Sequence, residues 1–197
     1  LIAATLDDDM YAPVAARLGV TRDIAKVAVL GAMYGQTTGQ GAVALRGLES
    51  AYPTAMGYLA DAARRAEGGN DLRTRGGRRV RMNGSPSSGN EDGPGRDERS
   101  RAAARGRYGR NAMIQGAAAE FFKTWAVIVR ARAGAHGAQI VLCLHDELLV
   151  HAPAGAADAV REIVDDGVQE ARYRWSSGSG VRFVADTSVV ARWSDAK

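Results

Sequence analysis

Apolar positions recur at helical spacing along most of this chain of 197 residues. In the first third, the pattern predicts four helices, at residues 10–18, 21–34, 42–50 and 53–67. The run Asp7 to Asp9 is suited to capping the first helix, because carboxylates accept its free N–H groups. The second helix is expected to turn one face to the core, formed by Ile24, Val27, Ala28 and Gly31. Residues 35–41, GQTTGQG, interrupt the apolar pattern and predict a loop.

The middle of the chain mixes short strand-like, polar and helical stretches. Residues 72–82 predict a hairpin that turns at Gly76 and Gly77 and carries arginines on both arms. Residues 83–95, NGSPSSGNEDGPG, predict a mobile polar loop. A basic helix over about 96–108 and a separate long helix over about 111–133 are expected to follow.

The last third combines strands with a helix. The β-rich runs 139–144 and 148–151 flank the triplet His145-Asp146-Glu147 and predict a hairpin with this triplet at its tip. A helix is expected over about 153–172, and a last strand over 181–190. Helices interspersed with a small antiparallel sheet make the expected fold class α+β.

Composition and charge narrow the function only slightly. The formal net charge is +4, but only three of the 26 basic residues are lysines, so the arginine excess partly reflects a GC-rich coding sequence. The single cysteine, Cys143, excludes a disulfide framework within the chain and is expected to be buried on its apolar strand. No apolar run approaches the ~18 to 20 residues of a membrane span. We therefore expect no membrane partner and a cytoplasmic location, which the single cysteine also suits.

The most informative stretch is VLCLHDELLVHAP, residues 141–153. Two adjacent carboxylates would be costly inside a buried strand, whereas at a hairpin tip they are held by the flanking strands and reach solvent. Such a tip suits Mg²⁺, which takes one or two protein carboxylates together with phosphate oxygens. On its own, however, the triplet is equally compatible with an ordinary polar turn.

A second candidate site lies on the helix predicted over 21–34. Arg22, Lys26, Leu30 and Tyr34 are spaced by four and so form one stripe along the helix. Two cations one turn apart are stabilised when an anion such as a triphosphate lies between them. Taken alone, the stripe is more simply interpreted as a solvated basic face.

Together these stretches resemble DNA polymerase family A, the polymerase I-like enzymes. Arg22, Lys26, Tyr34 and Gly35 match the family's Arg-x3-Lys-x7-Tyr-Gly helix, and the HDE triplet resembles its motif C. The segment RYGRNAMIQGAAAEFFKTWA is similar to the family's R-x3-N-x3-QG-x-A-A pattern, and GGRRVR is similar to its basic segment. The motifs occur in the family's order. The stretches YAPVAARLG and AKVAVLGAMYGQT are most similar to the bacterial branch of bifunctional 3′–5′ exonuclease/DNA polymerases.

The resemblance implies a right-hand polymerase architecture. It implies fingers over 1–67, with the nucleotide-binding helix at 21–34, and part of the palm over 68–197, with the loop 83–95 and the motif C hairpin 139–151. It also implies template-directed transfer of dNMP from dNTP to a primer 3′ end by two Mg²⁺ ions. The carboxylate turn and the cationic stripe are then expected to face a shared cleft.

The resemblance also implies a role for each matching residue. Arg22 and Lys26 would hold the triphosphate and act in catalysis, with the nucleotide site completed by Leu30, Tyr34 and Tyr11. Asp146 would ligate Mg²⁺, and Glu147 would lie close to the metals. Primer–template DNA would be bound by Arg107, Asn111, Gln115, His145, Arg78 and Arg79.

Some positions depart from the family pattern. Leu30 replaces the usual aromatic residue, Met113 a proline, and Tyr11 a phosphate-contacting histidine. The family's other metal aspartate, in motif A, precedes the matching helix. We therefore expect this chain to be an inactive fragment whose partners include the thumb, the motif A strand and possibly an exonuclease domain. The alternative is a non-catalytic DNA-binding relic. A metal-dependent phosphohydrolase would need further ligands that the sequence does not supply.

Overall fold

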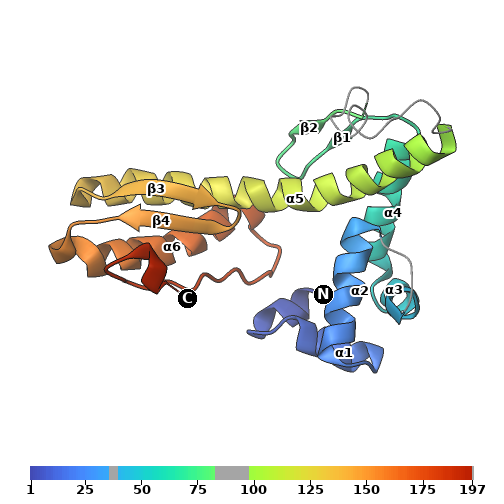
Figure 1. Ribbon diagram of the computed structural model, residues 1–197, viewed down its shortest axis with the longest axis horizontal. Helices are drawn as coiled ribbons and strands as arrows, with labels where there is room; N and C mark the ends of the chain where they lie inside the picture. The colour runs from blue at the N-terminus through green and yellow to red at the C-terminus, as the bar shows by residue number, and fades with distance from the viewer. Residues whose placement is uncertain (36–39, 83–97, 197) are drawn as a thin grey trace. The chain divides into compact units, whose positions relative to one another are not determined.

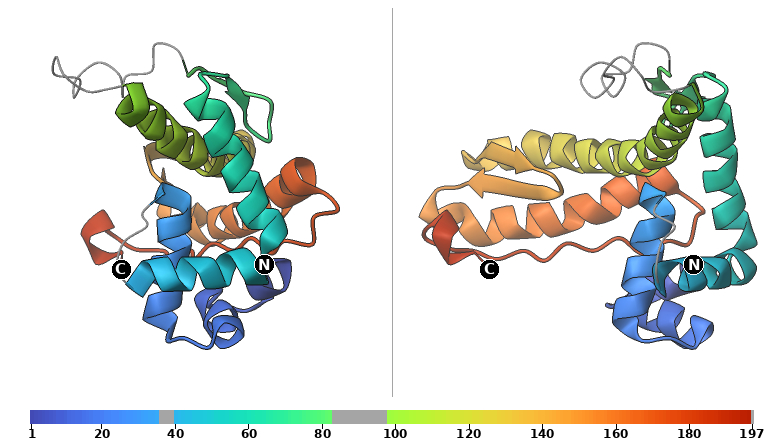
Figure 2. Two further views of the ribbon diagram at one scale, coloured as in Figure 1. Left: turned by 90° about the vertical axis from the view of Figure 1, so that its right-hand side faces the viewer. Right: turned by 45° about the vertical axis from the view of Figure 1, so that its right-hand side comes forward.

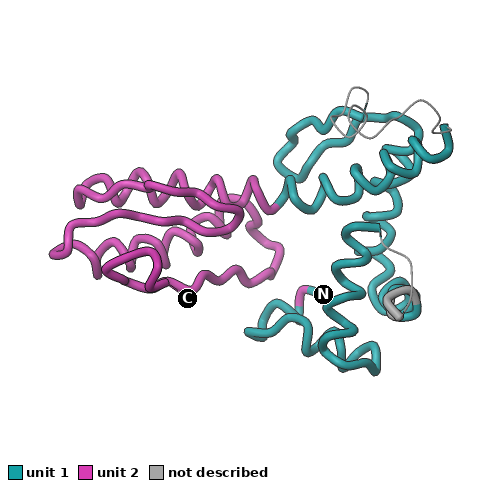
Figure 3. The backbone as a smooth tube through the Cα atoms, viewed as in Figure 1, with its two compact units in different colours: residues 1, 3–117 teal, residues 2, 118–197 magenta. Residues whose placement is uncertain are grey.

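The chain is mostly helical, with two small antiparallel sheets, in a computed structural model that describes residues 1–35, 40–82 and 98–196 (Figure 1). It forms two compact units, one made of Leu1 with residues 3–117 and the other of Ile2 with residues 118–197 (Figure 3). The predicted α+β class is confirmed. The predicted loop at 83–95, and residues 36–39 of the other predicted loop, lie outside the described residues.

Four helices open the first unit, as the sequence predicts. After a short 3-10 helix, Ile2–Leu6, they are α1 (Tyr11–Leu18), α2 (Arg22–Tyr34), α3 (Gln40–Ala51) and α4 (Pro53–Glu67). Helix α3 begins two residues earlier and ends one residue later than predicted. Figure 2 shows α1, α2 and α3 gathered into one bundle, with α4 leading from α3 toward the beginning of α5.

Helix α2 illustrates how local signals set the ends of an element while packing sets its buried face. The Thr21 hydroxyl accepts a hydrogen bond from the Ile24 amide at 3.4 Å, and Gly35 ends the helix with a φ of 73°. The buried face is a run of alanines: Ala25, Ala28 and Ala32. The predicted face was therefore right for Ala28, which is buried, and for Ile24, which packs against the core, but wrong for Val27, which is 57% exposed.

The arginine-bearing hairpin is present but short. Strand β1 (Leu72–Arg73) pairs antiparallel with β2 (Arg79–Val80), and Leu72 lies opposite Val80. Asp71 fixes the base of the hairpin, because its carboxylate accepts the Met82 amide at 2.9 Å and pairs with Arg79. Gly77 in the turn has a φ of 88°, a backbone conformation that favours glycine.

The two helices predicted over 96–108 and 111–133 are a single helix, α5 (Glu98–Ala133), so the predicted break was wrong. Gly109 does not end a helix here. A Cβ placed on Gly109 would lie 2.4 Å from the Cβ of Ala66. The glycine is needed for close contact between α5 and α4, and the helix continues through it. Helix α5 contributes residues 98–117 to the first unit and residues 118–133 to the second.

The second unit contains β3 (Gln139–Leu144), β4 (Glu147–His151) and α6 (Ala157–Ser176), which follows a short 3-10 turn, Ala154–Ala156. The predicted hairpin and helix are therefore present, although α6 starts four residues later and ends four residues later than expected. The core of the unit is formed by α5 and α6, and the sheet packs against it with Ile140, Leu148 and Val150. The Trp125 indole N–H donates to the Val164 carbonyl at 2.9 Å, which satisfies the one polar group of that buried ring.

Two further predictions for the second unit were wrong. Residues 181–190 form no strand in the described structure. Phe183 and Ala185 pack against the core, and Phe183 stacks on Phe121 at 4.1 Å between ring centroids while its carbonyl accepts from Gln169 at 3.3 Å. Cys143 is exposed, since β3 belongs to a sheet of only two strands. Among the described helices, none has both the length and the apolar character required to cross a membrane.

Candidate functional site

The predicted stripe on α2 lies on the side of the helix opposite the buried alanines. Arg22, Lys26 and Tyr34 are exposed, and Leu30 is half-buried. These positions are spaced by four, so they follow one face of α2. Among the residues that the structure describes, no carboxylate pairs with Lys26. Its ammonium group is therefore available to an anionic ligand.

Arg22 is held by a carboxylate from the beginning of α1. The guanidinium group donates to one carboxylate oxygen of Asp9, and the other oxygen accepts the Tyr11 amide at 3.0 Å. The guanidinium carbon lies 5.7 Å from the centroid of the Tyr11 ring. The structure thus brings together two residues, Arg22 and Tyr11, that were predicted to share a nucleotide site.

The ion pair perturbs both partners. The hydrogen bond from Arg22 lowers the pKa of the Asp9 carboxyl, and the same bond raises the pKa of Arg22. Both side chains remain substantially exposed, and exposed ion pairs of this kind are weak. A ligand with several negative charges can therefore displace Asp9 from Arg22, whereas it meets no such competitor at Lys26.

A second line of polar side chains follows α5. Arg107 and Gln115 are exposed and Asn111 is half-buried, and their spacing of four places them on one helix face. The side-chain oxygen of Asn111 is buried and accepts no hydrogen bond from any described residue. Buried acceptors are rarely left unsatisfied, and a hydrogen-bond donor on a ligand would satisfy this one.

The arginines of the β1–β2 hairpin divide into two groups. Arg73 donates to the Gly77 carbonyl at 2.9 Å and Arg79 pairs with Asp71, so these two stabilise the hairpin itself. The pKa of Asp71 is lowered, mainly by the hydrogen bond from the Met82 amide and secondly by that from Arg79. Arg78 lies in the turn region with its side chain exposed. The hairpin therefore presents cationic groups to solvent from a backbone that Asp71 holds in place.

The carboxylate turn lies at the tip of the β3–β4 hairpin. His145 and Asp146 form the turn, and Glu147 already belongs to β4, opposite Leu144, so the tip is one residue shorter than predicted. All three side chains are exposed. His145 has a φ of 53°, which is uncommon for a residue other than glycine and is a form of local strain that functional sites often carry.

The carboxylates of the turn fit part of a metal site. Neither Asp146 nor Glu147 is paired with a cation among the described residues. The described part of the chain contains no group of three or more potential metal ligands close together. Mg²⁺ needs only one or two protein carboxylates when substrate phosphates supply the rest, so this pair fits such an ion as a partial site.

The two compact units each hold part of the predicted site. The α2 stripe, Tyr11, the α5 line and the hairpin arginines belong to the first unit, whereas His145, Asp146 and Glu147 belong to the second. The expectation that they face a shared cleft stays a prediction. The assignment of residues 1–67 to fingers and 68–197 to palm also stays a prediction.

Two residues near the α2 stripe were not assigned a site role from the sequence. Asp9 was interpreted only as a helix cap, although it pairs with Arg22. Arg110 was placed in a gap between helices, although its guanidinium Nη1 donates to the Ala32 carbonyl of α2 at 3.2 Å. No sequence signal identifies either contact, because the partners lie 13 and 78 residues apart.

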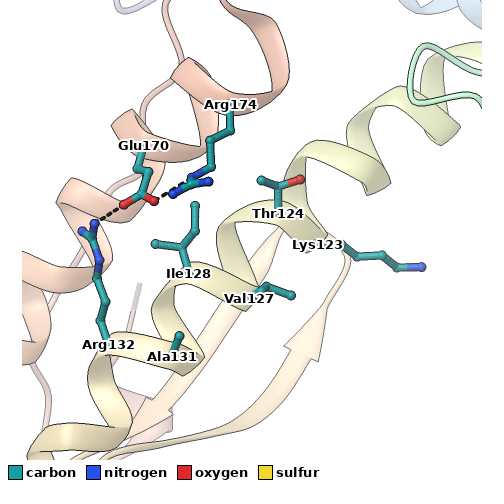
Figure 4. A pocket seen from close by; sticks show the side chains of 8 residues that line it. All are labelled: Lys123, Thr124, Val127, Ile128, Ala131, Arg132, Glu170 and Arg174. Atoms are coloured by element: carbon teal, nitrogen blue, oxygen red, sulfur yellow. Dashed lines mark hydrogen bonds and ion pairs between the residues drawn. The ribbon is translucent and has the colours of Figure 1, made fainter.

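A hollow of about 530 Å³ lies between α5 and α6 in the second unit (Figure 4). Glu170 accepts from both Arg132 and Arg174 at its edge, and the hydrogen bond from Arg174 is the main cause of its lowered pKa. The hollow is lined by Lys123, Thr124, Val127, Ile128, Ala131, Arg132, Glu170 and Arg174. None of the site residues predicted from the sequence is among them.

Comparisons with known proteins agree on one family. A family model described as DNA polymerase family A matches residues 7–195. DNA polymerase theta of Caenorhabditis elegans is 43% identical over 61 residues, which are 31% of this chain and 4% of that protein. The POL domain of Pol1 from M. smegmatis, in complex with DNA primer-template and dNTP, matches with a TM-score of 0.69 and 25% identity. That match covers 87% of this chain and 33% of the Pol1 chain, so the chain spans a third or less of the length of these relatives.

Proposed function

Because this chain belongs to DNA polymerase family A, we propose that it serves template-directed DNA synthesis as the fingers and part of the palm of a longer polymerase. The observation that carries the proposal is the carboxylate turn. Asp146 and Glu147 are exposed at a hairpin tip without a cationic partner among the described residues, in a chain that matches the family over residues 7–195. In this proposal, the primer 3′ hydroxyl attacks the α-phosphate of a dNTP and pyrophosphate leaves.

The α2 stripe would bind the nucleotide. Lys26 and Arg22 would hold the triphosphate, because phosphoryl transfer depends mainly on positioning and on neutralising charge that develops on the phosphates. Arg22 would exchange its weak, exposed contact with Asp9 for a phosphate oxygen. Tyr34 would lie near the incoming base pair, and Leu30 and Tyr11 would complete the nucleotide site.

The carboxylate turn would supply the metal ligands of this chain. Asp146 would hold Mg²⁺, with Glu147 close by, and further ligands would come from the motif A strand elsewhere in the polymerase. When bound, Mg²⁺ ions would stabilise the attacking and leaving oxygens of an in-line displacement. The flanking strands β3 and β4 would keep the two carboxylates in place through the reaction.

The α5 line and the hairpin would bind primer–template DNA. Arg107, Asn111 and Gln115, with His145 of the turn, would contact the primer terminus and its minor groove. The minor groove offers acceptors common to all base pairs, so such contacts check pair shape without reading sequence. Arg78 would contact duplex phosphates, and Arg79 would join it by exchanging its contact with Asp71 for a phosphate oxygen, so the affinity would depend on salt.

The test is primer extension by the full-length gene product with a defined template, dNTPs and Mg²⁺. Asp146→Ala is expected to lower the extension rate by a factor of at least about 100, as loss of a group that stabilises transition-state charge does. Its Kd for primer–template, measured by fluorescence anisotropy, is expected to stay within about twofold of wild type, since only charge at the metal changes.

The matched control is Asp166→Ala, which removes an exposed carboxylate from α6 and is expected to leave extension unchanged. Extension that survives in Asp146→Ala would refute the metal role. The alternative of a non-catalytic DNA-binding relic is motivated by the incomplete set of metal ligands in the described residues. It predicts that the wild-type protein binds primer–template but does not extend it.

A further inference from the structure

Helix α5 reaches the end of α2 through Arg110. We propose that Arg110 is a positioning residue that fixes the Tyr34 end of the nucleotide-binding helix relative to the primer-binding face of α5. This inference rests on the proposed polymerase function. It concerns a residue that lies within the segment similar to the family's R-x3-N-x3-QG-x-A-A pattern, but at a position that the pattern leaves unspecified.

The contact is made where α2 ends. The last four carbonyl groups of a helix have no partner within the helix, and the negative end of the helix dipole lies there. The Gly35 amide satisfies the Gly31 carbonyl, and Nη1 of Arg110 donates to the Ala32 carbonyl at 3.2 Å. An arginine at this end is stabilised both by the hydrogen bond and by the dipole.

The charge of Arg110 has no other partner among the described residues. It forms no ion pair with a described carboxylate, although its side chain is partly buried. A partly buried guanidinium group is costly unless its donors are used. The carbonyl end of α2 is therefore the electrostatic partner that keeps Arg110 in this place.

A second contact holds the same junction. A Cβ placed on Gly35 would lie 2.9 Å from Cγ of Arg107, so the end of α2 packs directly against the aliphatic part of that side chain. Arg107 and Arg110 are three residues apart and lie on neighbouring positions of one helix surface. Helix α5 thus locates the end of α2 at two points, by packing at Gly35 and by a hydrogen bond at Ala32.

The position of this junction gives it a function. Tyr34 is two residues beyond Ala32, and Asn111 is the residue after Arg110. The group proposed to lie near the incoming base pair and the group proposed to contact the primer terminus are therefore linked through one hydrogen bond. Removing that bond leaves the helices in place but lets the end of α2 move relative to α5, because helix ends fray when their carbonyls lose a partner.

The experiment compares three variants of the full-length protein. Arg110→Met keeps the length and apolar stem of the side chain but removes the donor and the charge. Arg110→Lys keeps the charge and one ammonium group, without the fork of the guanidinium. Arg130→Met is the matched control, because it removes an exposed arginine from the same helix. Each is measured for KM and kcat with the correct dNTP, Kd for primer–template, and hydrogen exchange of the amides at residues 33–35.

In Arg110→Met, KM for the dNTP is expected to rise by about tenfold, in keeping with loss of a hydrogen bond from a charged donor. The Kd for primer–template is expected to stay within about twofold, while the amides at 33–35 exchange faster, as a locally opened helix end does. Arg110→Lys is expected to fall between this variant and wild type, and Arg130→Met to match wild type.

A purely structural role gives a different result. Loss of folded protein lowers kcat in proportion and leaves KM unchanged, and a distorted α5 weakens primer–template binding together with KM. The proposal would be overturned if the two Arg110 variants showed a lowered kcat with unchanged KM, or a weakened Kd for primer–template together with a raised KM. Unchanged hydrogen exchange of the amides at residues 33–35 would overturn it as well. If the wild-type protein fails to extend primers, the polymerase proposal fails, and the exchange measurement still decides whether Arg110 holds the end of α2.

Discussion

A single methyl group added to Gly109 should separate α5 from α4. A Cβ at this position would lie 2.4 Å from the Cβ of Ala66 and 3.1 Å from Cδ1 of Leu72, whereas apolar carbons in contact normally lie about 4 Å apart. Neither neighbour can move away easily, because Ala66 is fixed on α4 and Leu72 is fully buried. Substitution of Gly109 by alanine therefore forces the two helices apart.

The size of the effect follows from two opposing contributions. Alanine is more favourable than glycine inside a helix by about 1 kcal/mol. Overpacking a close contact costs about 1 to 3 kcal/mol. Gly57 in α4 provides the control, because a Cβ there would meet no atom within 4 Å, so Gly57→Ala gains the helix contribution alone. The free energy of unfolding of the two variants should therefore differ by about 1 to 3 kcal/mol.

The assay is thermal unfolding followed by circular dichroism, with both variants measured beside wild type. For a protein of this size, 1 kcal/mol corresponds to about 2 to 4 °C in Tm, so Gly109→Ala is expected to melt roughly 2 to 12 °C below Gly57→Ala. Equal stabilisation by the two substitutions would refute the close packing of α5 on α4. It would also favour the interpretation of Gly109 as an ordinary flexible position.

Two further predictions concern charged groups. Lys26→Met is expected to raise the KM for dNTP by about tenfold with a smaller change in kcat, since it removes a cation from the proposed triphosphate site. An unchanged KM in steady-state primer extension would count against that site. The pKa of Asp71 lies below its ordinary value of 3.8, mainly because its carboxylate accepts the Met82 amide. As the pH falls, the unfolded chain therefore takes up a proton at this carboxyl before the folded chain does. The stability that Asp71 provides is lost as the pH falls below about 4. Acid unfolding should therefore be less steep in Asp71→Asn than in wild type, and identical profiles would argue against this role.

Sequence patterns predicted most elements of this fold, because their signals are local. Thr21 and Gly35 mark the ends of α2 by capping, and Pro53 marks the start of α4. The triplet at residues 145–147 marks the tip of the β3–β4 hairpin. The turn there has two residues, the first in the left-handed conformation, and the strands pair again directly beyond it. Each of these signals depends on neighbours within a few residues.

The errors arose where tertiary contacts decide. The sequence predicts a break between residues 108 and 111, whereas Gly109 lies inside a continuous helix, where it allows close contact with Ala66. Residues 181–190 have the alternation of a strand, but Phe183 and Ala185 pack against the core of the second unit without strand pairing. The candidate site shows the same division. Residues that match family motifs could be predicted from the sequence, whereas the contacts of Asp9 and Arg110 with distant residues could not.

The continuity of α5 restricts how this chain can change in length. Its 36 residues form one helical ladder that runs from the first unit into the second. Each residue of an α-helix advances it by 1.5 Å and turns it by about 100°. One codon inserted or deleted between Gln115 and Trp125 would rotate every later side chain against every earlier one by that angle. A substitution leaves this helical phase unchanged, whereas an insertion or deletion alters it, so length variation among relatives should fall in the connections between helices.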